Sequence, residues 1–181
     1  MSFFDPFPLL STPRLRLRCL ELDDAEIMFE NLNTPEAVRF GGKAPPANVA
    51  ATREKIEKIL ATLRAGEGIS WALTDIETGA YLGGAALWRW DKPNFRAEVG
   101  YELSSRVWGR GLMTEAVRAI LAFGFQRMDL HSVEAKVHPE NTASIRVLEK
   151  LGFQREALFR ENHFNGVRFE DTAVYSLLAP G

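Results

Sequence analysis

The sequence predicts an α+β, or mixed α/β, sheet. Strand-like segments outnumber helix-like segments, and only the helices of the second half separate strands in the manner of crossover units. Three successive strand-like segments with short turns between them occupy residues 69–104, a spacing typical of antiparallel strands. This order differs from the regular strand–helix alternation of a doubly wound dinucleotide-binding fold.

The first half of the chain begins with a loose segment, residues 1–13. Residues 14–20 alternate basic and mostly apolar side chains with a period of two, which predicts a half-buried strand. A helix is expected from Asp23 to about Asn33, with acidic residues at its N-terminus. A second helix is expected from about Val49 to Arg64, ended by the glycines that follow it.

The second half supplies most of the strands. Alternation, turn residues and apolar periodicity predict them together with two helices. The expected strands are 69–75, 81–90, 96–104, 132–138, 153–164 and 168–178, and the expected helices are 114–128 and 141–151. Asn165-Gly166 is a strong signal for a final hairpin.

Length and composition exclude several classes of protein. The chain of 181 residues is expected to form a single domain, 1–181, with 46% hydrophobic and 25% charged residues. The net charge of −2 and the lack of any Lys/Arg run argue against a nucleic-acid partner. No apolar run is long enough for a membrane span.

Cysteine and histidine usage points to a reducing compartment and to no metal site. Cys19 is the only cysteine, so no intrachain disulfide is possible, and we expect a cytoplasmic protein. The start of the chain is broken by Pro6 and Pro8 and does not resemble a signal peptide. His131 and His138 lack plausible ligand partners in the sequence, so no metal is predicted.

The junction between the strand 96–104 and the next helix carries the strongest functional signal. It reads Arg106-Val107-Trp108-Gly109-Arg110-Gly111-Leu112-Met113-Thr114. Two glycines before a helix allow backbone N–H groups to converge on one point, and the helix N-terminus adds partial positive charge, so an anion such as a phosphate should bind here. The alternative interpretation is a tight strand-to-helix turn.

The spacing excludes two common phosphate sites. A dinucleotide fingerprint requires a third glycine where this chain has Thr114, and a P-loop requires Gly-Lys-Ser/Thr where Gly111 is followed by Leu112. A nucleotide-binding oxidoreductase is therefore disfavoured. What remains is Arg-x-x-Gly-x-Gly between a strand and a helix.

A second motif follows at Asn141-Thr142-Ala143-Ser144-Ile145-Arg146-Val147-Leu148. On a helix Asn141, Ser144 and Leu148 share one face. Together with Arg106-x-x-Gly109-x-Gly111 this motif resembles the GNAT superfamily of N-acetyltransferases, most closely the branch of the ribosomal-protein alanine N-acetyltransferases (RimJ/RimL-like). Further resemblance lies in Thr12-Pro13-Arg14, Gly100-Tyr101, Thr114-Glu115-Ala116, Asn165-Gly166 and Asp171.

The resemblance covers nearly the whole chain and implies a particular sheet. About seven mostly antiparallel strands, with helices on both faces, should splay apart between the strand of Gly100-Tyr101 and the strand 133–137. Acetyl-CoA should lie in that gap and leave as CoA. The implied partner is an amine acceptor, either a protein N-terminus or a small molecule, and the family precedent favours a homodimer.

Cofactor contacts are expected from three segments. The pyrophosphate should bind the N–H groups of Val107 through Thr114, and the free edge of the strand with Tyr101 and Leu103 can pair with pantetheine amides. Asn141 reaches the cofactor in the family, although it also suits a helix N-cap. The predicted cofactor-binding residues are Tyr101, Leu103, Arg106, Val107, Trp108, Gly109, Arg110, Gly111, Leu112, Met113, Thr114, Asn141 and Ser144.

The candidates for catalysis are a serine and two glutamates. Ser144 is the predicted hydrogen-bond donor to the CoA thiolate, because Leu148 replaces the tyrosine that many family members use as general acid. The alternative for Ser144 is a bond back to its own helix. Glu102 or Glu161 is the predicted general base, and for each the alternative is an ordinary surface acid.

A second class of function also fits the sequence. A non-catalytic acyl-CoA-binding or sensor module would keep the phosphate-binding loop and lose turnover, and the missing tyrosine at Leu148 is its only support. Release of CoA thiol and acetylated product with an amine would exclude it.

Overall fold

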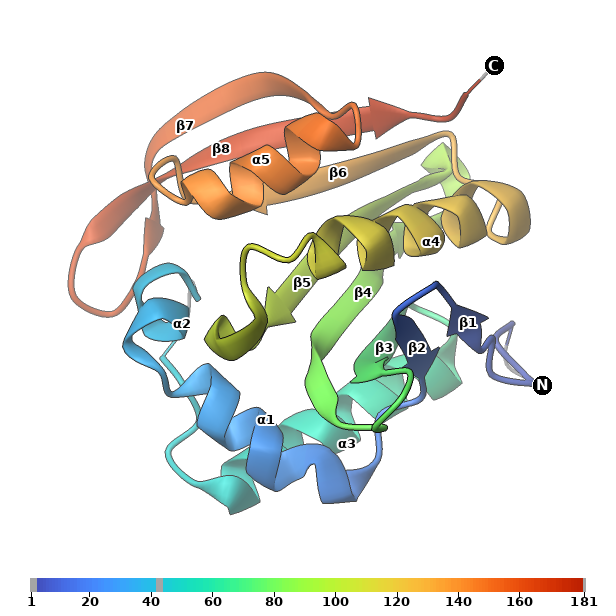
Figure 1. Ribbon diagram of the computed structural model, residues 1–181. Helices are drawn as coiled ribbons and strands as arrows, with labels where there is room; N and C mark the ends of the chain where they lie inside the picture. Colours follow the sequence, from blue (N-terminus) through green and yellow to red (C-terminus); the bar gives the residue numbers. More distant parts are fainter. Residues whose placement is uncertain (1–2, 42–43, 181) are drawn as a thin grey trace.

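A computed structural model describes residues 3–41 and 44–180 of the chain (Figure 1). In these residues eight strands form one sheet in the order β1-β2-β3-β4-β5-β6-β8-β7. Every neighbouring pair is antiparallel except β5 and β6. The strands are β1 Leu10–Ser11, β2 Leu15–Arg18, β3 Ile69–Asp75, β4 Tyr81–Asp91, β5 Arg96–Leu103, β6 Ser132–Val137, β7 Gln154–Phe164 and β8 Phe169–Leu178.

Helices cover both faces of the sheet (Figure 1). Alternation along β3 shows this directly, because Trp71 and Leu73 belong to the core under α4, whereas Ala72 packs with the layer of α1 and α3. The helices are α1 Ala25–Leu32, α2 Pro35–Phe40, α3 Val49–Ala65, α4 Leu112–Arg127 and α5 Thr142–Lys150, with 3-10 turns at Leu22–Asp24, Lys92–Asn94 and Ser105–Val107. The mixed, mostly antiparallel architecture predicted from the sequence is confirmed.

The structure corrects three details of the prediction. Residues 1–13 are not all loose, since β1 lies among them and brings the count in the described residues to eight rather than about seven. The short helix α2 was not predicted; Thr34 caps it and Pro35 is its first residue. Helix α4 begins at Leu112, two residues early, because Gly111 adopts the left-handed conformation of its N-cap.

The parallel pair β5–β6 is short. Its register joins Arg96 to Ser132, Ala97 to Val133 and Glu98 to Glu134, and no further pairs follow in the described chain. Each strand keeps its other neighbour, β4 or β8, along its length. The two halves of the sheet therefore separate after Glu98, at the place that the sequence predicted.

Two adjacent glycines on β4 differ in how closely β5 approaches them. A Cβ added at Gly83 would lie 2.3 Å from the carbonyl oxygen of Glu102 and 2.9 Å from the Cα of Leu103, which are backbone atoms that cannot move alone. A Cβ added at Gly84 would meet nothing closer than 3.5 Å. Gly83 is thus required for the spacing between β4 and β5.

We predict that Gly83→Ala lowers the free energy of unfolding by about 2 kcal/mol, because overpacking of this kind typically costs 1–3 kcal/mol. Gly84→Ala is the matched control on the next residue and should cost less than about 1 kcal/mol. Urea unfolding followed by circular dichroism measures both. Equal losses in the two variants would contradict this account of Gly83.

Candidate active site

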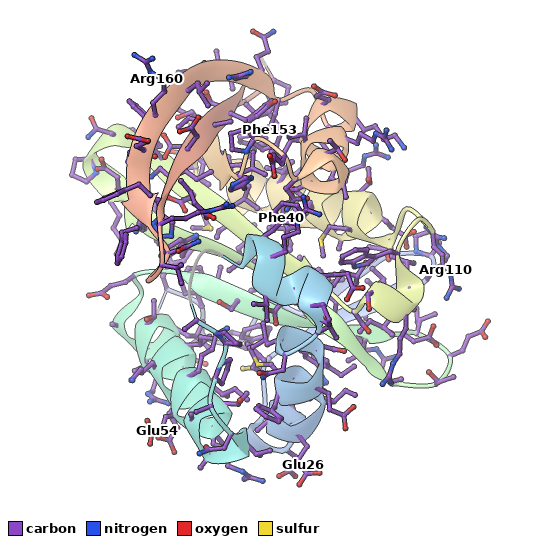
Figure 2. The ribbon with its side chains drawn as sticks, turned by 90° about the vertical axis from the view of Figure 1, so that its left-hand side faces the viewer. Glu26, Phe40, Glu54, Arg110, Phe153 and Arg160 are labelled. Atoms are coloured by element: carbon purple, nitrogen blue, oxygen red, sulfur yellow. The ribbon has the colours of Figure 1, made fainter. Side chains whose placement is uncertain are left out.

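A pocket of about 110 Å³ fills the gap between β5 and β6. One wall comes from β5, the opposite wall from β6 and the segment after it, and α5 closes one side. Phe40, the last residue of α2, also lines the pocket (Figure 2). The lining residues are Phe40, Val99, Gly100, Tyr101, Ala135, Lys136, Val137, His138, Asn141, Ser144 and Leu148.

The pocket brings together residues that the sequence singled out from two separate motifs. Tyr101 on β5 and Ser144 in the first turn of α5 meet there, with 2.8 Å between the phenol oxygen and Oγ. Leu148 lies one turn further along α5 and is fully buried. Burial raises the pKa of Tyr101 to about 12, although the hydrogen bond with Ser144 opposes the shift.

Asn141 caps the helix that carries Ser144. Its Oδ1 accepts the N–H of Ser144 at 3.1 Å, so the N-cap interpretation is confirmed. The cap fixes the first turn of α5 and with it the direction of the Ser144 side chain. Contact between Asn141 and the cofactor stays a prediction.

The glycine loop leads into α4 with both glycines in the left-handed region. Gly109 has φ +75° and Gly111 has φ +76°, conformations that residues with a Cβ rarely adopt. No side chain caps α4, and Leu112 and Met113 are buried in the core. The N–H groups of the first turn of α4 are therefore open to an anion.

Part of the predicted phosphate loop is already engaged. The N–H of Val107 donates to the carbonyl of Ser104, and the N–H of Trp108 donates to the carbonyl of Ser105. The Trp108 indole donates to the carbonyl of Leu103 at 2.8 Å. We therefore expect the pyrophosphate to bind only the N–H groups from Gly109 to Thr114.

The two arginines of the loop are exposed, as a phosphate-binding role requires. Arg106 lies 3.8 Å from Glu30 of α1, in an ion pair with both side chains in solvent. Arg110 lies at the edge of the molecule, on the loop before α4 (Figure 2). Such exposed pairs exchange readily with other partners, so Arg106 can turn toward an anion.

A polar clamp holds the loop against the start of the chain, and sequence reasoning missed it. Glu115 in α4 accepts hydrogen bonds from the Thr12 hydroxyl, from the Arg14 backbone N–H and from the Arg14 guanidinium. Arg14 also donates to the carbonyl of Arg110 at 2.9 Å. Burial alone would raise the pKa of Glu115, but these hydrogen bonds outweigh it and lower the pKa. Thr12-Pro13-Arg14 and Thr114-Glu115-Ala116 are both points of family resemblance, but nothing in the sequence indicates that they meet.

The candidate bases lie in different surroundings. Glu102 faces the layer of α1 and α3, where its Oε1 is 3.5 Å from the Tyr81 hydroxyl. Burial raises the pKa of Glu102, although the charge of Lys55 and the Tyr81 hydrogen bond oppose this shift. Glu161 is exposed on β7, where its backbone N–H donates to Asp171 at 2.8 Å. Neither glutamate lines the pocket.

Glu98, the other carboxylate on the same face of β5, is held by cations. Arg89 and Lys136 each approach its Oε2 to 3.0 Å, and Lys136 also contacts Glu134 at 2.9 Å. Burial alone would lower the pKa of Lys136, but the bonds with Glu134 and Glu98 outweigh it and raise the pKa. Lys136 therefore lines the pocket as a cation and cannot serve as a neutral base.

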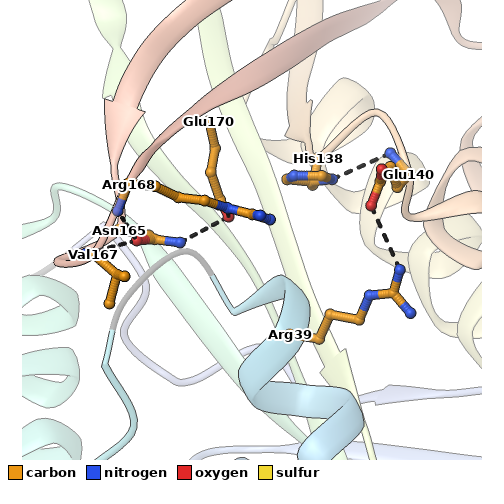
Figure 3. Close-up of polar contacts among 7 residues, drawn as sticks. All are labelled: Arg39, His138, Glu140, Asn165, Val167, Arg168 and Glu170. Carbon is orange, nitrogen blue, oxygen red and sulfur yellow. Dashed lines mark hydrogen bonds and ion pairs between the residues drawn. The ribbon is translucent and has the colours of Figure 1, made fainter.

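Charged side chains of both signs lie on α2, on the segment after β6 and on the β7–β8 hairpin (Figure 3). Arg39 of α2 pairs with Glu140, after β6, at 3.5 Å, and the Phe40 ring lies 5.6 Å from the ring of His138. On the β7–β8 hairpin Glu170 accepts from Asn165 at 2.7 Å and from Arg168 at 3.3 Å.

Two further findings concern the described residues as a set. Residues 3–41 and 44–180 contain no group of three histidine, cysteine or acidic side chains arranged to hold a metal ion. Within the same ranges no helix has the length and apolar character needed to cross a membrane.

The geometry agrees with comparisons to known proteins. A family model described as an acetyltransferase (GNAT) domain matches residues 14–154. The chain belongs to the GNAT acetyltransferases. It is 36% identical over 169 residues to the uncharacterized N-acetyltransferase p20 of Bacillus licheniformis, and this match covers 93% of this chain and 95% of that protein.

Ribosomal-protein acetyltransferases are among the more distant relatives of this GNAT chain. A [ribosomal protein uS5]-alanine N-acetyltransferase of Escherichia coli (strain K12) is 27% identical over 82 residues, 45% of this chain and 42% of that protein. The structure of RimL, a ribosomal L7/L12 alpha-N-protein acetyltransferase solved with coenzyme A, superposes with a TM-score of 0.83 at 15% identity, over 94% of this chain and 98% of RimL. That likeness concerns the fold. The chain is an acetyl-CoA-dependent N-acetyltransferase.

We predict that Glu115→Gln weakens CoA binding about tenfold, a change of about 1.4 kcal/mol. The substitution keeps the size of the side chain but loses the ion pair with Arg14, so the start of α4 and the carbonyl of Arg110 are no longer fixed together. Calorimetric titration with CoA measures the change. Glu54→Gln, on the exposed face of α3 (Figure 2), is the control and should bind as the unaltered chain does. Identical Kd values for CoA in all three proteins would refute a role of the clamp in CoA binding.

Proposed function

We propose that this acetyltransferase acts on a primary amine, either a protein N-terminus or a small molecule, by direct attack on the thioester. The observation that carries the proposal is the continuity of three features along β5. Its unpaired edge begins at the pocket that holds Ser144 and runs to the glycine loop and the uncapped first turn of α4.

The residues present fit CoA at each point. The N–H groups from Gly109 to Thr114, with Arg106 and Arg110, would hold the pyrophosphate. The backbone of β5 from Gly100 to Leu103 has no strand partner on the side of the gap in the described chain. Apart from the Leu103 carbonyl, which accepts the Trp108 indole N–H, this edge suits the amides of an extended pantetheine arm. When bound, acetyl-CoA supplies an activated acetyl carbon.

The residues of the chain then have distinct tasks. The acceptor amine must be neutral to attack, and free alkyl amines have a pKa of roughly 10. A carboxylate removes the proton, for which Glu102 and Glu161 are the candidates. Ser144 donates a hydrogen bond to the departing sulfur, because Leu148 has no donor. A serine hydroxyl is too weak an acid to do more than that near neutral pH.

We place the acceptor beside the charged side chains of Figure 3, on α2, after β6 and on the β7–β8 hairpin. The likeness to the uS5-alanine acetyltransferase supports a protein N-terminus. A small amine is the alternative, since a surface with charges of both signs can receive either acceptor. We further propose that the protein is a single-domain homodimer in the cytoplasm and binds no nucleic acid. Sedimentation of the purified protein would test the dimer, and a binding assay would test for nucleic acid.

The phosphate loop provides the first test. In a Gly109→Val/Gly111→Val variant, branched side chains at positive φ should reshape the loop, and micromolar binding of CoA and acetyl-CoA in calorimetry should be lost. Gly79→Val is the matched control, because Gly79 has nearly the same φ, +73°, and open space like Gly109, but lies in the β3–β4 turn. Absence of binding by the folded unaltered chain would refute the cofactor site. Binding without thiol release, over a panel of amines, would favour the sensor module.

The general base provides a second test. Since burial raises the pKa of Glu102, a base at this position is protonated at low pH, and kcat/KM should rise with pH through that raised pKa. Glu102→Gln should lower kcat/KM by 10²-fold or more, the typical contribution of a general base, and remove this rise. Glu161→Gln is the parallel variant. If a variant keeps the pH profile of kcat/KM seen in the unaltered enzyme, the substituted glutamate is not the base. If both variants keep it, solvent takes the proton.

A further inference from the structure

A pair of hydroxyl groups, those of Tyr101 and Ser144, joins two walls of the pocket. Tyr101 was expected to contact the cofactor through the backbone of β5. Its phenol instead reaches across to α5, 2.8 Å from Ser144 Oγ and 3.3 Å from the carbonyl oxygen of Ser144. These residues are 43 positions apart in the chain.

The hydrogens of this pair allow two arrangements. In one, the phenol donates to Ser144 Oγ, and the serine hydrogen is left for a third atom in the pocket. In the other, the serine donates to the phenol, and the phenol donates to the Ser144 carbonyl over the longer distance of 3.3 Å. That carbonyl already belongs to the hydrogen-bond ladder of α5, so the first arrangement makes the better use of both groups.

Two neighbouring side chains of the pocket lining have partners of their own. Lys136 is held by Glu98 and Glu134, and Nδ1 of His138 accepts the backbone N–H of Glu140 at 3.2 Å. Leu148 contributes only apolar surface. Since its pKa is about 12, the phenol keeps its hydrogen over the whole pH range in which the enzyme would work.

We propose that Tyr101 is a positioning residue for acetyl transfer: its phenol donates to Ser144 Oγ and thereby directs the serine hydrogen at the sulfur that leaves. This inference rests on the proposed function. The amine nitrogen forms the new C–N bond, the C–S bond breaks with its electron pair on sulfur, and sulfur finally carries the proton that the nitrogen loses. Tyr101 and Ser144 keep their own protons and stabilise the developing negative charge.

Kinetics provide the first test. Tyr101→Phe keeps the ring in place and should lower kcat about tenfold, with the KM for acetyl-CoA and the Kd for CoA changed less than about twofold, because the lost interaction forms only as the sulfur becomes negative. Ser144→Ala should lower kcat at least as much. The double variant should be no slower than Ser144→Ala, since the two hydroxyls act as a unit. Tyr175→Phe, in the core of β8, is the matched control and should match the unaltered enzyme.

A spectroscopic test does not depend on turnover. With CoA bound, the ultraviolet absorbance of its thiolate reports the pKa of the thiol. In the unaltered chain this pKa should lie about one unit lower than in Tyr101→Phe, a tenfold difference in ionisation, because the directed hydrogen bond favours the charged sulfur.

The outcomes separate this inference from the proposed function. An active enzyme whose kcat and bound-thiol pKa are the same in Tyr101→Phe would overturn the inference and leave the function standing. A raised KM with unchanged kcat would also overturn it, because that result means a packing role. If the thiol pKa differs between the unaltered chain and Tyr101→Phe but the chain acetylates no amine, the positioning role of Tyr101 is supported and the proposed function is refuted.

Discussion

The short parallel pairing of β5 and β6 is the constraint on which the rest of the site depends. After three residue pairs the strands separate, while β4 and β8 hold their outer edges. Separation leaves main-chain N–H and C=O groups of β5 facing a gap, and such groups need partners. An extended ligand with amide groups would satisfy them as a further strand would, which supports the proposed cofactor site.

Ion pairs hold the point at which the strands part. Arg96 contacts Glu134 from β5 to β6, and Lys136 contacts Glu98 in the reverse direction, close to the last paired residues. Their carboxylates are mostly buried, and losing one partner there would leave a charge without compensation. The same contacts hold Glu98 and Lys136 in ion pairs at this point of the sheet.

The sequence was informative where the signal is local. Gly109 and Gly111 occupy the left-handed conformations that their position before a helix suggested, and Asn141 is the cap that its position suggested. The sequence failed where the partners are distant. Glu115 meets Arg14 across 101 positions, and no periodicity encodes that contact. A two-residue strand such as β1 shows no alternation at all. In contrast, Thr34-Pro35 did carry a helix-start signal for α2.

The alternation of β5 divides the chemistry between the two faces of the sheet. Val99, Tyr101 and Leu103 face the core under α4 and α5, whereas Glu98 and Glu102 face the other helical layer. Gly100 lies between these glutamates, and a Cβ there would come within 3.3 Å of the Trp88 indole nitrogen. The missing side chain at Gly100 therefore leaves room for the Trp88 indole to pack against β5 at the level of the pocket. The Tyr101 hydroxyl and the carboxylate of Glu102, a candidate base, therefore lie on opposite faces of one strand.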